Sequence, residues 1–358
     1  RSGKHPGAGV SRTFPSFAPW SLDPNASLAA LRALLPAAAF AVLGCQLPAL
    51  WLRRLALIII VFAVLSVVIG VAQVAQGPAS ELRPYLPTNP EDAVGLFANR
   101  NHYAVLLVGA LILVLGGLME DGFVARRGVR KALQLGGWVL LASILLLGIA
   151  LARSRAAVGL AVAVSAIMVV LALLQKRDGR NPLTKMTLVL AVGGLIAFQY
   201  GFLEIVERFS REGDEYRWAV LPDVLRAATQ YGWLGSGLGS FPSVYAPLES
   251  IDMLTPGRFQ HAHNDWAELW VDVGILALPL AMLFFLWIGK AVFELFARGL
   301  FAQQQHVARI VGSLLVALFC LHSLVDYPLR TTTLSTIFIF ACLLSAQPLA
   351  NLARDERA

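Results

Sequence analysis

The chain has 358 residues, of which 57% are hydrophobic and only 14% are charged, and its mean hydropathy is +0.68. Soluble domains contain roughly 45–50% apolar and about 25% charged residues, so this composition excludes an ordinary soluble protein. The formal net charge of +7 does not indicate a nucleic-acid partner, because the basic residues cluster at the ends of apolar runs, as they do in membrane proteins. We expect a lipid bilayer around the chain and no nucleic acid.

Long apolar runs predict transmembrane helices, since about 20 apolar residues cross the hydrocarbon core of a bilayer. The run at 51–73 is the least ambiguous, whereas Arg32 and Pro36 interrupt the first one. The nine predicted spans are residues 28–47, 51–73, 101–119, 132–152, 155–174, 184–203, 266–289, 309–329 and 332–349. We therefore expect an all-α integral membrane protein, a polytopic bundle of about nine transmembrane helices.

Lysine and arginine in the short connections predict the orientation of the helices, because cytoplasmic loops carry the excess of these residues. The richer, alternating set is Arg53, Arg54, Arg126, Arg127, Arg130, Lys131, Lys176, Arg177, Arg180, Lys185, Lys290, Arg298, Arg354 and Arg357. The opposite, poorer set is Arg83, Arg100, Arg153, Arg155 and Arg330. We expect the richer set on the cytoplasmic side and the poorer set outside.

This orientation divides the chain into five parts. Residues 1–27 are predicted to be an extracytoplasmic N-terminal segment, 28–203 to hold helices one to six, 204–265 to form one large extracytoplasmic loop, 266–349 to hold helices seven to nine, and 350–358 to be a cytoplasmic tail. The first residue is Arg1 rather than Met, and no signal peptide is visible. We leave open that the N-terminal segment is truncated and that further helices precede it.

The large loop is expected to carry short helices. Trp218, Leu221, Leu225 and Ala228 recur at helical spacing, which predicts an amphipathic helix lying on the bilayer surface. The run at 232–241 is too rich in glycine for a regular element. No strand precedes it and no Gly-Lys-Ser/Thr follows, so a nucleotide-binding loop is excluded. A tight turn that brings backbone amides near a ligand stays open.

Arginines gather on the predicted outer face, where a permanently charged, planar guanidinium suits a phosphate. For Arg153, Arg208 and Arg211, contact with lipid headgroups is the simpler interpretation. Arg155 and Arg217 are the better candidates for binding an anion. Arg155 opens an apolar helix at the positive end of its dipole, where a cation is unfavourable without a compensating anion. A diphosphate whose lipid tail lies in the bilayer would supply that anion.

His261 and His263 stand just before the seventh predicted span. Imidazole titrates near neutral pH and suits general-base catalysis, for example on a sugar hydroxyl that attacks an activated anomeric carbon. Two alternatives stay open. One is a metal pair completed by Asp265, although no third ligand stands nearby in the sequence; the other is a pair of loop histidines without a role.

Carboxylates and cysteines give weaker signals. Asp265, Glu268 and Asp272 fall on one helical face, and Asp265 with Glu268 fits a capping box, so capping is the favoured role of Asp265. The three cysteines are Cys45, Cys320 and Cys342. All three lie in apolar runs without metal spacing and are expected to be small packing residues. We predict no metal and no cofactor, and the chain has no Asp-x-Asp pair for a metal-held nucleotide sugar.

A series of motifs, in this order, resembles those of the O-antigen ligase / Wzy polymerase superfamily. The motifs are residues 95–104 (GLFANRNHYA), 154–157 (SRAA), 217–220 (RWAV) followed by 235–241 (GSGLGSF), 261–266 (HAHNDW) running on to 272–274 (DVG), and 322–330 (HSLVDYPLR). The last of them is similar to a motif of exopolysaccharide polymerase-like members. The resemblance covers about residues 90–345 and departs at Asp272, where the family usually has glutamate.

The resemblance implies a metal-independent, inverting glycosyltransferase of the bacterial inner membrane, with its active site facing the periplasm. The donor would be a glycan on undecaprenyl diphosphate, and the acceptor another glycan or a lipopolysaccharide core. By position, His263 would be the catalytic base, and Arg155, Arg217 and Arg100 would hold the donor diphosphate. The supporting polar residues would be His261, His102, Asn264, Asp272 and Arg330.

The 322–330 motif favours a polymerase that extends a lipid-linked chain. A ligase that transfers the glycan to lipopolysaccharide core stays open, as does transfer to a protein. The alternative from another class is a transporter of the same lipid-linked sugar. Transporters place polar residues near the membrane midplane and often show repeated halves, whereas the polar residues here gather at one predicted face.

Overall fold

The computed structural model describes residues 21–86, 88–120, 129–175, 186–191, 193–195, 215–231, 233–249, 259–298, 300 and 305–347. Every regular element in this part of the chain is a helix, and the described residues contain no strand. The prediction of an all-α protein is therefore confirmed. Predictions that concern residues 1–20, most of the sixth predicted span and the tail at 350–358 lie outside the described residues.

Six helical segments are long and apolar enough to cross a membrane. They are α1 (Pro24–Gly44), α2 (Ala49–Gln76), α3 (Arg100–Glu120), α4 (Val129–Leu151, apolar from Ala132), α5 (Arg155–Leu174) and the segment Asp265–Ala297, which holds α9 and α10. Shorter apolar helices occupy the other three predicted spans: Met186–Leu195, α11 (Gln305–His322) and α12 (Thr332–Ala346). The prediction of a membrane protein is thus confirmed by six candidate spans, whereas the predicted number of nine spans stays a prediction.

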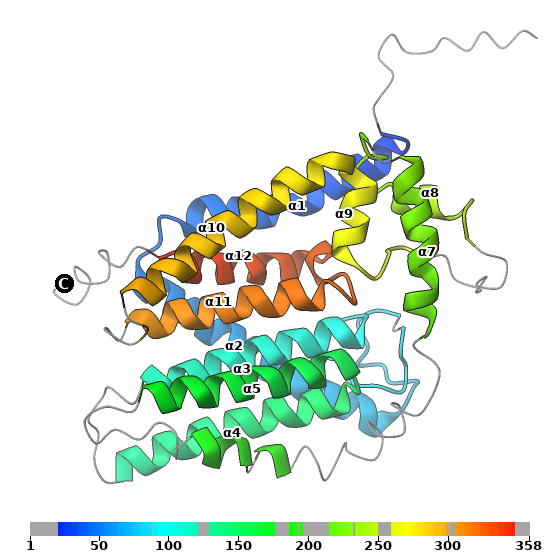
Figure 1. Ribbon diagram of the computed structural model, residues 1–358. Coiled ribbons are helices and arrows are strands. Elements are labelled where there is room, and N and C mark those ends of the chain that lie inside the picture. Colours follow the sequence, from blue (N-terminus) through cyan, green and yellow to red (C-terminus); the bar gives the residue numbers. More distant parts are fainter. Residues whose placement is uncertain are drawn as a thin grey trace, which may run out of the picture.

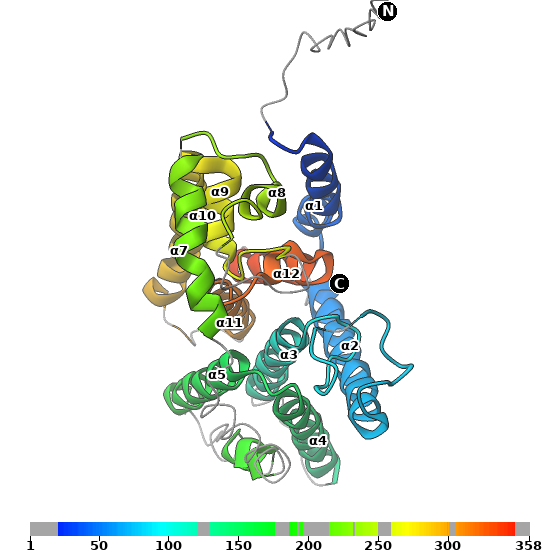
Figure 2. The same cartoon turned by 90° about the vertical axis from the view of Figure 1, so that its right-hand side faces the viewer.

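The helices α1 to α5 and α10 to α12 run side by side, while α7, α8 and α9 gather at one end of this bundle (Figure 1). Seen along the bundle, α7 (Glu215–Gln230) crosses in front of it, beside α8 (Phe241–Tyr245) and α9 (Asp265–Val273) (Figure 2). We call this the capped end. The turn between α4 and α5 and the connection between α2 and α3 lie at the same end.

The centre of the bundle is α3, which is buried along almost its whole length between α2, α4, α5 and α11. Glycines let two neighbours approach it closely. A Cβ on Gly116 would lie 2.3 Å from Val311, and one on Gly117 would lie 2.6 Å from Trp138. Because α3 is fixed in this way, its first polar residues, Asn101 and His102, are held in the middle of the capped end.

The predicted span at 266–289 is divided at Gly274. There α9 ends and a short 3₁₀ turn, η3 (Gly274–Leu276), leads into α10 (Ala277–Ala297). Gly274 has φ of 59°, and a Cβ on it would lie 2.6 Å from the backbone nitrogen of Gly235, so a glycine is required at this bend. As a result α9 lies across the capped end, whereas α10 runs along the bundle (Figure 1).

The helix predicted in the large loop exists as α7, but its buried face differs from the predicted one. Val220, Val224 and Ala227 are buried in a small core shared with α8 and α9, while Leu225 is 53% exposed. Ala228 of the predicted stripe is also in this core. The core contacts therefore use a face that only partly overlaps the stripe, and contact of α7 with the bilayer surface stays a prediction. The side chain of Trp218 lies outside the described part.

The predicted span at 309–329 also ends early. α11 stops at His322, and the chain turns before a 3₁₀ turn, η4 (Pro328–Arg330), leads into α12. The turn is closed by backbone hydrogen bonds from Val325 and Asp326 to the carbonyl of His322. This end-turn, residues 323–331, brings the polar part of the 322–330 motif to the capped end.

Candidate functional site

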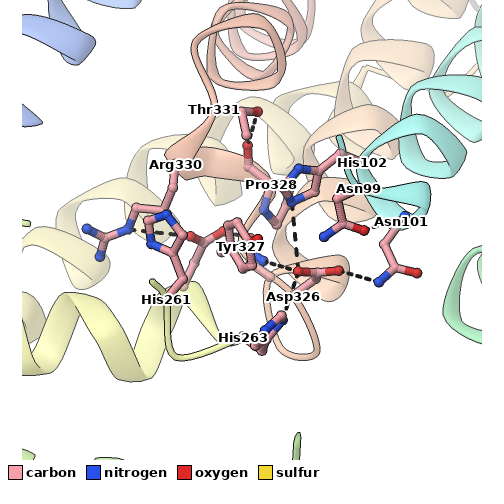
Figure 3. A network of polar contacts seen from close by, with 12 residues as sticks. Asn99, Asn101, His102, His261, His263, Asp326, Tyr327, Pro328, Arg330 and Thr331 are labelled. Carbon is pink, nitrogen blue, oxygen red and sulfur yellow. Dashed lines mark hydrogen bonds and ion pairs between the residues drawn. The ribbon is translucent and has the colours of Figure 1, made fainter. Parts of the chain in front are cut away.

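Asp326 is the centre of a polar cluster at the capped end (Figure 3). Its side chain is fully buried. Oδ2 accepts a hydrogen bond from Nδ2 of Asn101 at 2.6 Å, and Oδ1 accepts one from the backbone nitrogen of Tyr327 at 3.0 Å. The first residues of α3 are thereby tied to the end-turn, far away in the sequence.

Two histidines approach the same oxygen of this carboxylate. Nδ1 of His263 lies 3.4 Å from Oδ1 of Asp326, and Nε2 of His102 lies 3.8 Å from it. The side chain of His263 is 26% exposed, whereas that of His102 is 5% exposed. His263 is therefore the histidine of this pair that a ligand can reach. Its φ of 50° is in the left-handed region, a kind of backbone strain that recurs at functional sites.

Tyr327 brings three imidazole rings together. Its ring centre lies 4.3 Å from that of His261, 4.7 Å from that of His102 and 5.0 Å from that of His263. Phe259 packs edge-on against the other side of His263, with ring centres 6.3 Å apart. The structure thus brings together three of the histidines that the motifs singled out, and an aromatic side chain sets their spacing.

The three carboxylates of α9 do share one face, as predicted, and that face is buried against Arg330. Nη1 of Arg330 donates to Oδ2 of Asp272 at 2.6 Å and lies 3.4 Å from Oε1 of Glu268, while Nε lies 3.6 Å from Oδ1 of Asp265. Burial alone would lower the pKa of Arg330, but Glu268, Asp272 and Asp265 together raise it above its ordinary value. Arg330 is thus a fixed cation that joins α9 to the end-turn.

His261 forms a second pair with a carboxylate. Its Nδ1 lies 3.0 Å from Oε1 of Glu268, and Oε2 of Glu268 accepts a hydrogen bond from the backbone nitrogen of Ala262 at 2.8 Å. A carboxylate oxygen can only accept hydrogen bonds, so Nδ1 of His261 carries the hydrogen. Its side chain is 31% exposed, so Nε2 is the ring nitrogen left for a ligand.

The predicted capping role of Asp265 is wrong, because Asn264 caps α9. Oδ1 of Asn264 accepts a hydrogen bond from the nitrogen of Ala267 at 3.0 Å, and its Nδ2 donates to the carbonyl of Leu324. Asp265 instead accepts hydrogen bonds from Oγ of Ser323 and from the nitrogen of Leu329. The two residues fasten the start of α9 to the end-turn, which explains why His263, just before them, stays beside Asp326.

Arg100 was predicted to hold the donor diphosphate, and one nitrogen of its guanidinium is paired within the protein. Its Nη1 donates to Oδ2 of Asp92 at 2.6 Å, and both side chains are buried. Nη1 of Arg153 lies 3.5 Å from the other oxygen of Asp92. These bonds fasten the connection between α2 and α3 to the turn between α4 and α5, a packing role that accounts for Arg100 without a ligand.

Arg155 opens α5, as its position after Ser154 predicts. Oγ of Ser154 accepts a hydrogen bond from the nitrogen of Ala157 at 3.4 Å and caps the helix. Arg155 is half-buried at the capped end, next to Arg153, whose φ is also 50°. Arg217 lies in the first turn of α7 at the same end, and its side chain, like Arg208 and Arg211 as a whole, lies outside the described residues.

The glycine-rich run serves as a clamp on the C-terminal end of α9. The backbone nitrogens of Gly235, Ser236 and Gly237 donate to the carbonyls of Tyr231, Val271 and Asp272, each at 2.9 Å. These three amides are therefore paired within the protein. They do not donate to a ligand, which answers for them the question left open by the sequence.

Metal binding has no support in the described part of the chain, which contains no group of three or more histidine, cysteine or acidic residues able to hold an ion. Cys45 is exposed, Cys320 is half-buried, Cys342 is buried, and none forms a disulfide. Independence from metal stays a prediction for the reaction itself.

Sequence reasoning misses three residues that organise the site. The sequence marks Asp326 and Tyr327 only as part of the 322–330 motif, and it does not mark Asp92 at all. A signal for Asp326 is present in the 322–330 motif, where Asp326 and Arg330 interrupt an apolar region. Charged residues at membrane depth cost free energy, and they usually have a function there. No such signal exists for Asp92, which lies in an ordinary polar connection.

One of three comparisons with known proteins found a match. A family model described as O-antigen ligase (Wzy_C) matches residues 140–285, a stretch that begins in α4, ends in α10 and includes Arg155, Arg217, His261 and His263. No curated protein and no solved structure matched the chain. The resemblance recognised from the motifs is thus confirmed by a family model over residues 140–285, where the chain is similar to the O-antigen ligase family.

Proposed function

We propose that the protein is a membrane glycosyltransferase that takes its glycan from a lipid-linked diphosphate donor, and that it works as a polysaccharide polymerase. The observation that carries the proposal is the position of His263, an accessible imidazole beside the buried carboxylate of Asp326. The pair lies at one end of a bundle that holds six candidate membrane spans. A lipid-linked substrate would present its diphosphate at such an end.

His263 acts as the general base in this proposal. The hydrogen of the neutral ring is assigned to Nδ1 in this proposal, because Nδ1 lies 3.4 Å from the carboxylate of Asp326 and a carboxylate only accepts. The lone pair on Nε2 is then left to receive a proton. The acceptor hydroxyl loses its proton to Nε2, and its oxygen bonds to the anomeric carbon. The bond from that carbon to the diphosphate oxygen breaks, and the electron pair leaves with the lipid diphosphate. Attack opposite the leaving group inverts the anomeric centre.

Arg155 and Arg217 bind the diphosphate in this proposal. Guanidinium groups form paired, charge-assisted hydrogen bonds with phosphate oxygens, and the start of α5 adds the positive end of a helix dipole. Arg100 is left out of this role because its guanidinium binds Asp92. It supports the site by holding the connection between α2 and α3 in place.

We place the enzyme in the bacterial inner membrane with the capped end on the periplasmic side. Support comes from the distribution of lysine and arginine, since the connections at the capped end belong to the poorer set and cytoplasmic loops carry the excess. The glycan acceptor would then be met outside the cytoplasm, where the polymer is assembled.

A ligase is the second candidate function, and the description of the matching family favours it. Ligase and polymerase would share the donor and the base, and would differ only in the acceptor: lipopolysaccharide core for the ligase, a second lipid-linked glycan for the polymerase. A transporter is less well supported, because the elements that carry the polar cluster, namely the start of α3, the start of α9 and the end-turn, lie at an end of the bundle (Figure 1) rather than at its middle.

The deciding experiment incubates the purified protein with a lipid-diphosphate-linked oligosaccharide alone and separates the products by gel and mass spectrometry. A ladder of multiples on the lipid supports the polymerase. Transfer only after lipopolysaccharide core is added means a ligase, and no product in either reaction contradicts glycosyl transfer. A parallel reaction with EDTA is expected to be equally active, and a loss that added metal restores would contradict the metal-independent mechanism.

A further inference from the structure

Five apolar side chains from three separate segments are exposed together at the capped end. They are Leu22 (56% exposed), Trp233 (77%), Leu234 (57%), Ile275 (39%) and Leu276 (56%). We call this group the apolar corner. Contiguous exposed apolar groups on a protein mark sites that contact a partner or a membrane, so we expect the corner to be covered by one of these.

The corner is held together by its backbone. The nitrogen of Leu22 donates to the carbonyl of Ser236 at 2.9 Å, and the nitrogen of Ile275 donates to the carbonyl of Trp233 at 3.3 Å. A Cβ on Gly274 would lie 2.8 Å from the backbone of Trp233, which shows how closely these two segments pass. The exposed side chains are therefore presented by a fixed frame.

The position of the corner along the bundle is given by the first residues of two helices in candidate spans. Leu22 stands just before α1, which begins at Pro24, and Leu276 stands just before α10, which begins at Ala277. Both helices start at the capped end and lie along the same side of the bundle (Figure 1). The corner is thus level with the place where two apolar helices would leave the hydrocarbon core.

Exposed apolar residues continue from the corner along both helices. On α1 they include Leu28 and Leu31, and on α10 they include Leu278, Leu280 and Met282. In a helix that crosses a membrane, such residues face the lipid chains. None of the five corner residues is charged, and the neighbouring Asp23 caps α1 by accepting a hydrogen bond from the nitrogen of Ala26. Tryptophan is enriched where a membrane protein meets the interface. Its surroundings therefore match one occupant, the lipid bilayer.

We propose that the apolar corner is inserted into the interfacial layer of the bilayer, so that the segment of Trp233 and Leu234 dips into the membrane. This proposal does not depend on the glycosyltransferase function. It changes the view of the predicted loop at 204–265, part of which becomes a membrane contact. The glycine-rich run that follows Leu234 holds the carbonyls of Val271 and Asp272, so the contact also fixes the height of α9 relative to the lipid.

Spin labels test the insertion directly. The full chain without its natural cysteines (C45A, C320A, C342A) receives one cysteine, Leu234→Cys or Trp233→Cys, and is reconstituted in nanodiscs. Leu278→Cys on α10 serves as the lipid-facing control and Thr229→Cys, on an exposed position of α7, as the water-facing control. Both corner labels are expected to collide more with oxygen than with a water-soluble nickel complex, as the Leu278→Cys label does.

Two results would overturn the proposal. Corner labels that behave like the one at Thr229→Cys would mean a corner in water, and labels that neither reagent reaches would mean a corner covered by protein. If the cysteine-free chain does not fold, brominated lipids replace the spin labels. The emission of Trp233 is obtained as the difference between the wild-type spectrum and that of Trp233→Phe. Brominated lipids must quench this difference, and an unquenched difference contradicts insertion.

Discussion

His261 and Glu268 lie 3.0 Å apart, from Nδ1 to Oε1, whereas Nδ1 of His263 lies 3.4 Å from Oδ1 of Asp326. Both imidazole rings pack against Tyr327, so two imidazole–carboxylate pairs share one aromatic ring. The carboxylates come from different elements, α9 and the end-turn. Replacing the two histidines one at a time can identify which of them is the base, and the double variant measures how far the pairs are coupled through Tyr327.

Replacing His263 with asparagine removes the proposed base and keeps the backbone. The φ of 50° at His263 is better tolerated by asparagine than by alanine. General-base catalysis contributes about 10²–10⁴-fold, so kcat of H263N should fall by about that factor while donor binding is retained. Transfer rates and donor binding of the purified variants check this. A larger loss of kcat in H261N than in H263N would move the base role to His261.

Asp326→Asn keeps the shape of the side chain and removes the charge beside His263. The imidazole is then no longer held with its hydrogen on Nδ1, and the comparable exchange in a catalytic triad lowers kcat about 10⁴-fold. We expect kcat of D326N to fall by about 10²-fold or more, with a changed pH profile. The control is Glu81→Gln, at an exposed carboxylate of the connection after α2. An unaltered profile in D326N would leave Asp326 as a packing residue.

Arg155→Ala should weaken binding of the donor more than it slows the chemical step. Hydrogen bonds to a charged group contribute about 1.5–3 kcal/mol, so the donor Kd should rise by about 10- to 100-fold. Arg298→Ala, at an exposed arginine just after α10, is the matched control and should bind the donor normally. Binding is measured by titration with a lipid diphosphate. Equal Kd values for the two variants would remove Arg155 from the diphosphate site.

Arg100→Ala should destabilise the fold. Arg100 and Asp92 form a buried ion pair of 2.6 Å, and removal of one partner from such a pair typically lowers the free energy of unfolding by about 3–5 kcal/mol. The change is measured as a lower Tm of the purified protein in detergent. R100A combined with Asp92→Asn should regain part of the loss, because the buried carboxylate that has lost Arg100 is then neutral; its remaining contact with Arg153 is the longer one, at 3.5 Å. A normal Tm together with lost donor binding would instead support the diphosphate role first expected for Arg100.

Local patterns in the sequence predicted the features that depend on neighbouring residues. The start of α5 after Ser154, the shared face of Asp265, Glu268 and Asp272, and the helix α7 were all expected from apolar runs and helical spacing. These properties are set within one or two helical turns, where helix geometry alone fixes which side chains meet.

Features that depend on contacts between distant segments were not predicted. The bend at Gly274 is required by the close passage of Gly235, and the buried face of α7 is chosen by α8 and α9. Asp326 becomes the centre of the site only because α3 brings Asn101 and His102 beside it. Neither the hydropathy nor the spacing along one segment contains that information.

Gly235→Ala tests the clamp that joins the glycine-rich run to α9. Gly235 has φ of 74°, a conformation that costs other residues about 1–2 kcal/mol, and its new Cβ would lie 2.3 Å from the carbonyl oxygen of Asp272. We expect a lower Tm and a loss of activity, because the end of α9 must move and Asp272 holds Arg330. Gly136→Ala is the control.

Gly136 lies in α4, and a Cβ added to it would have no atom within 4 Å. Alanine favours a helix over glycine by about 1 kcal/mol, so G136A should keep or raise the Tm. The contrast separates strain at the clamp from a general effect of adding a methyl group. If G235A and G136A unfold at the same temperature and transfer glycan equally well, the clamp does not position α9.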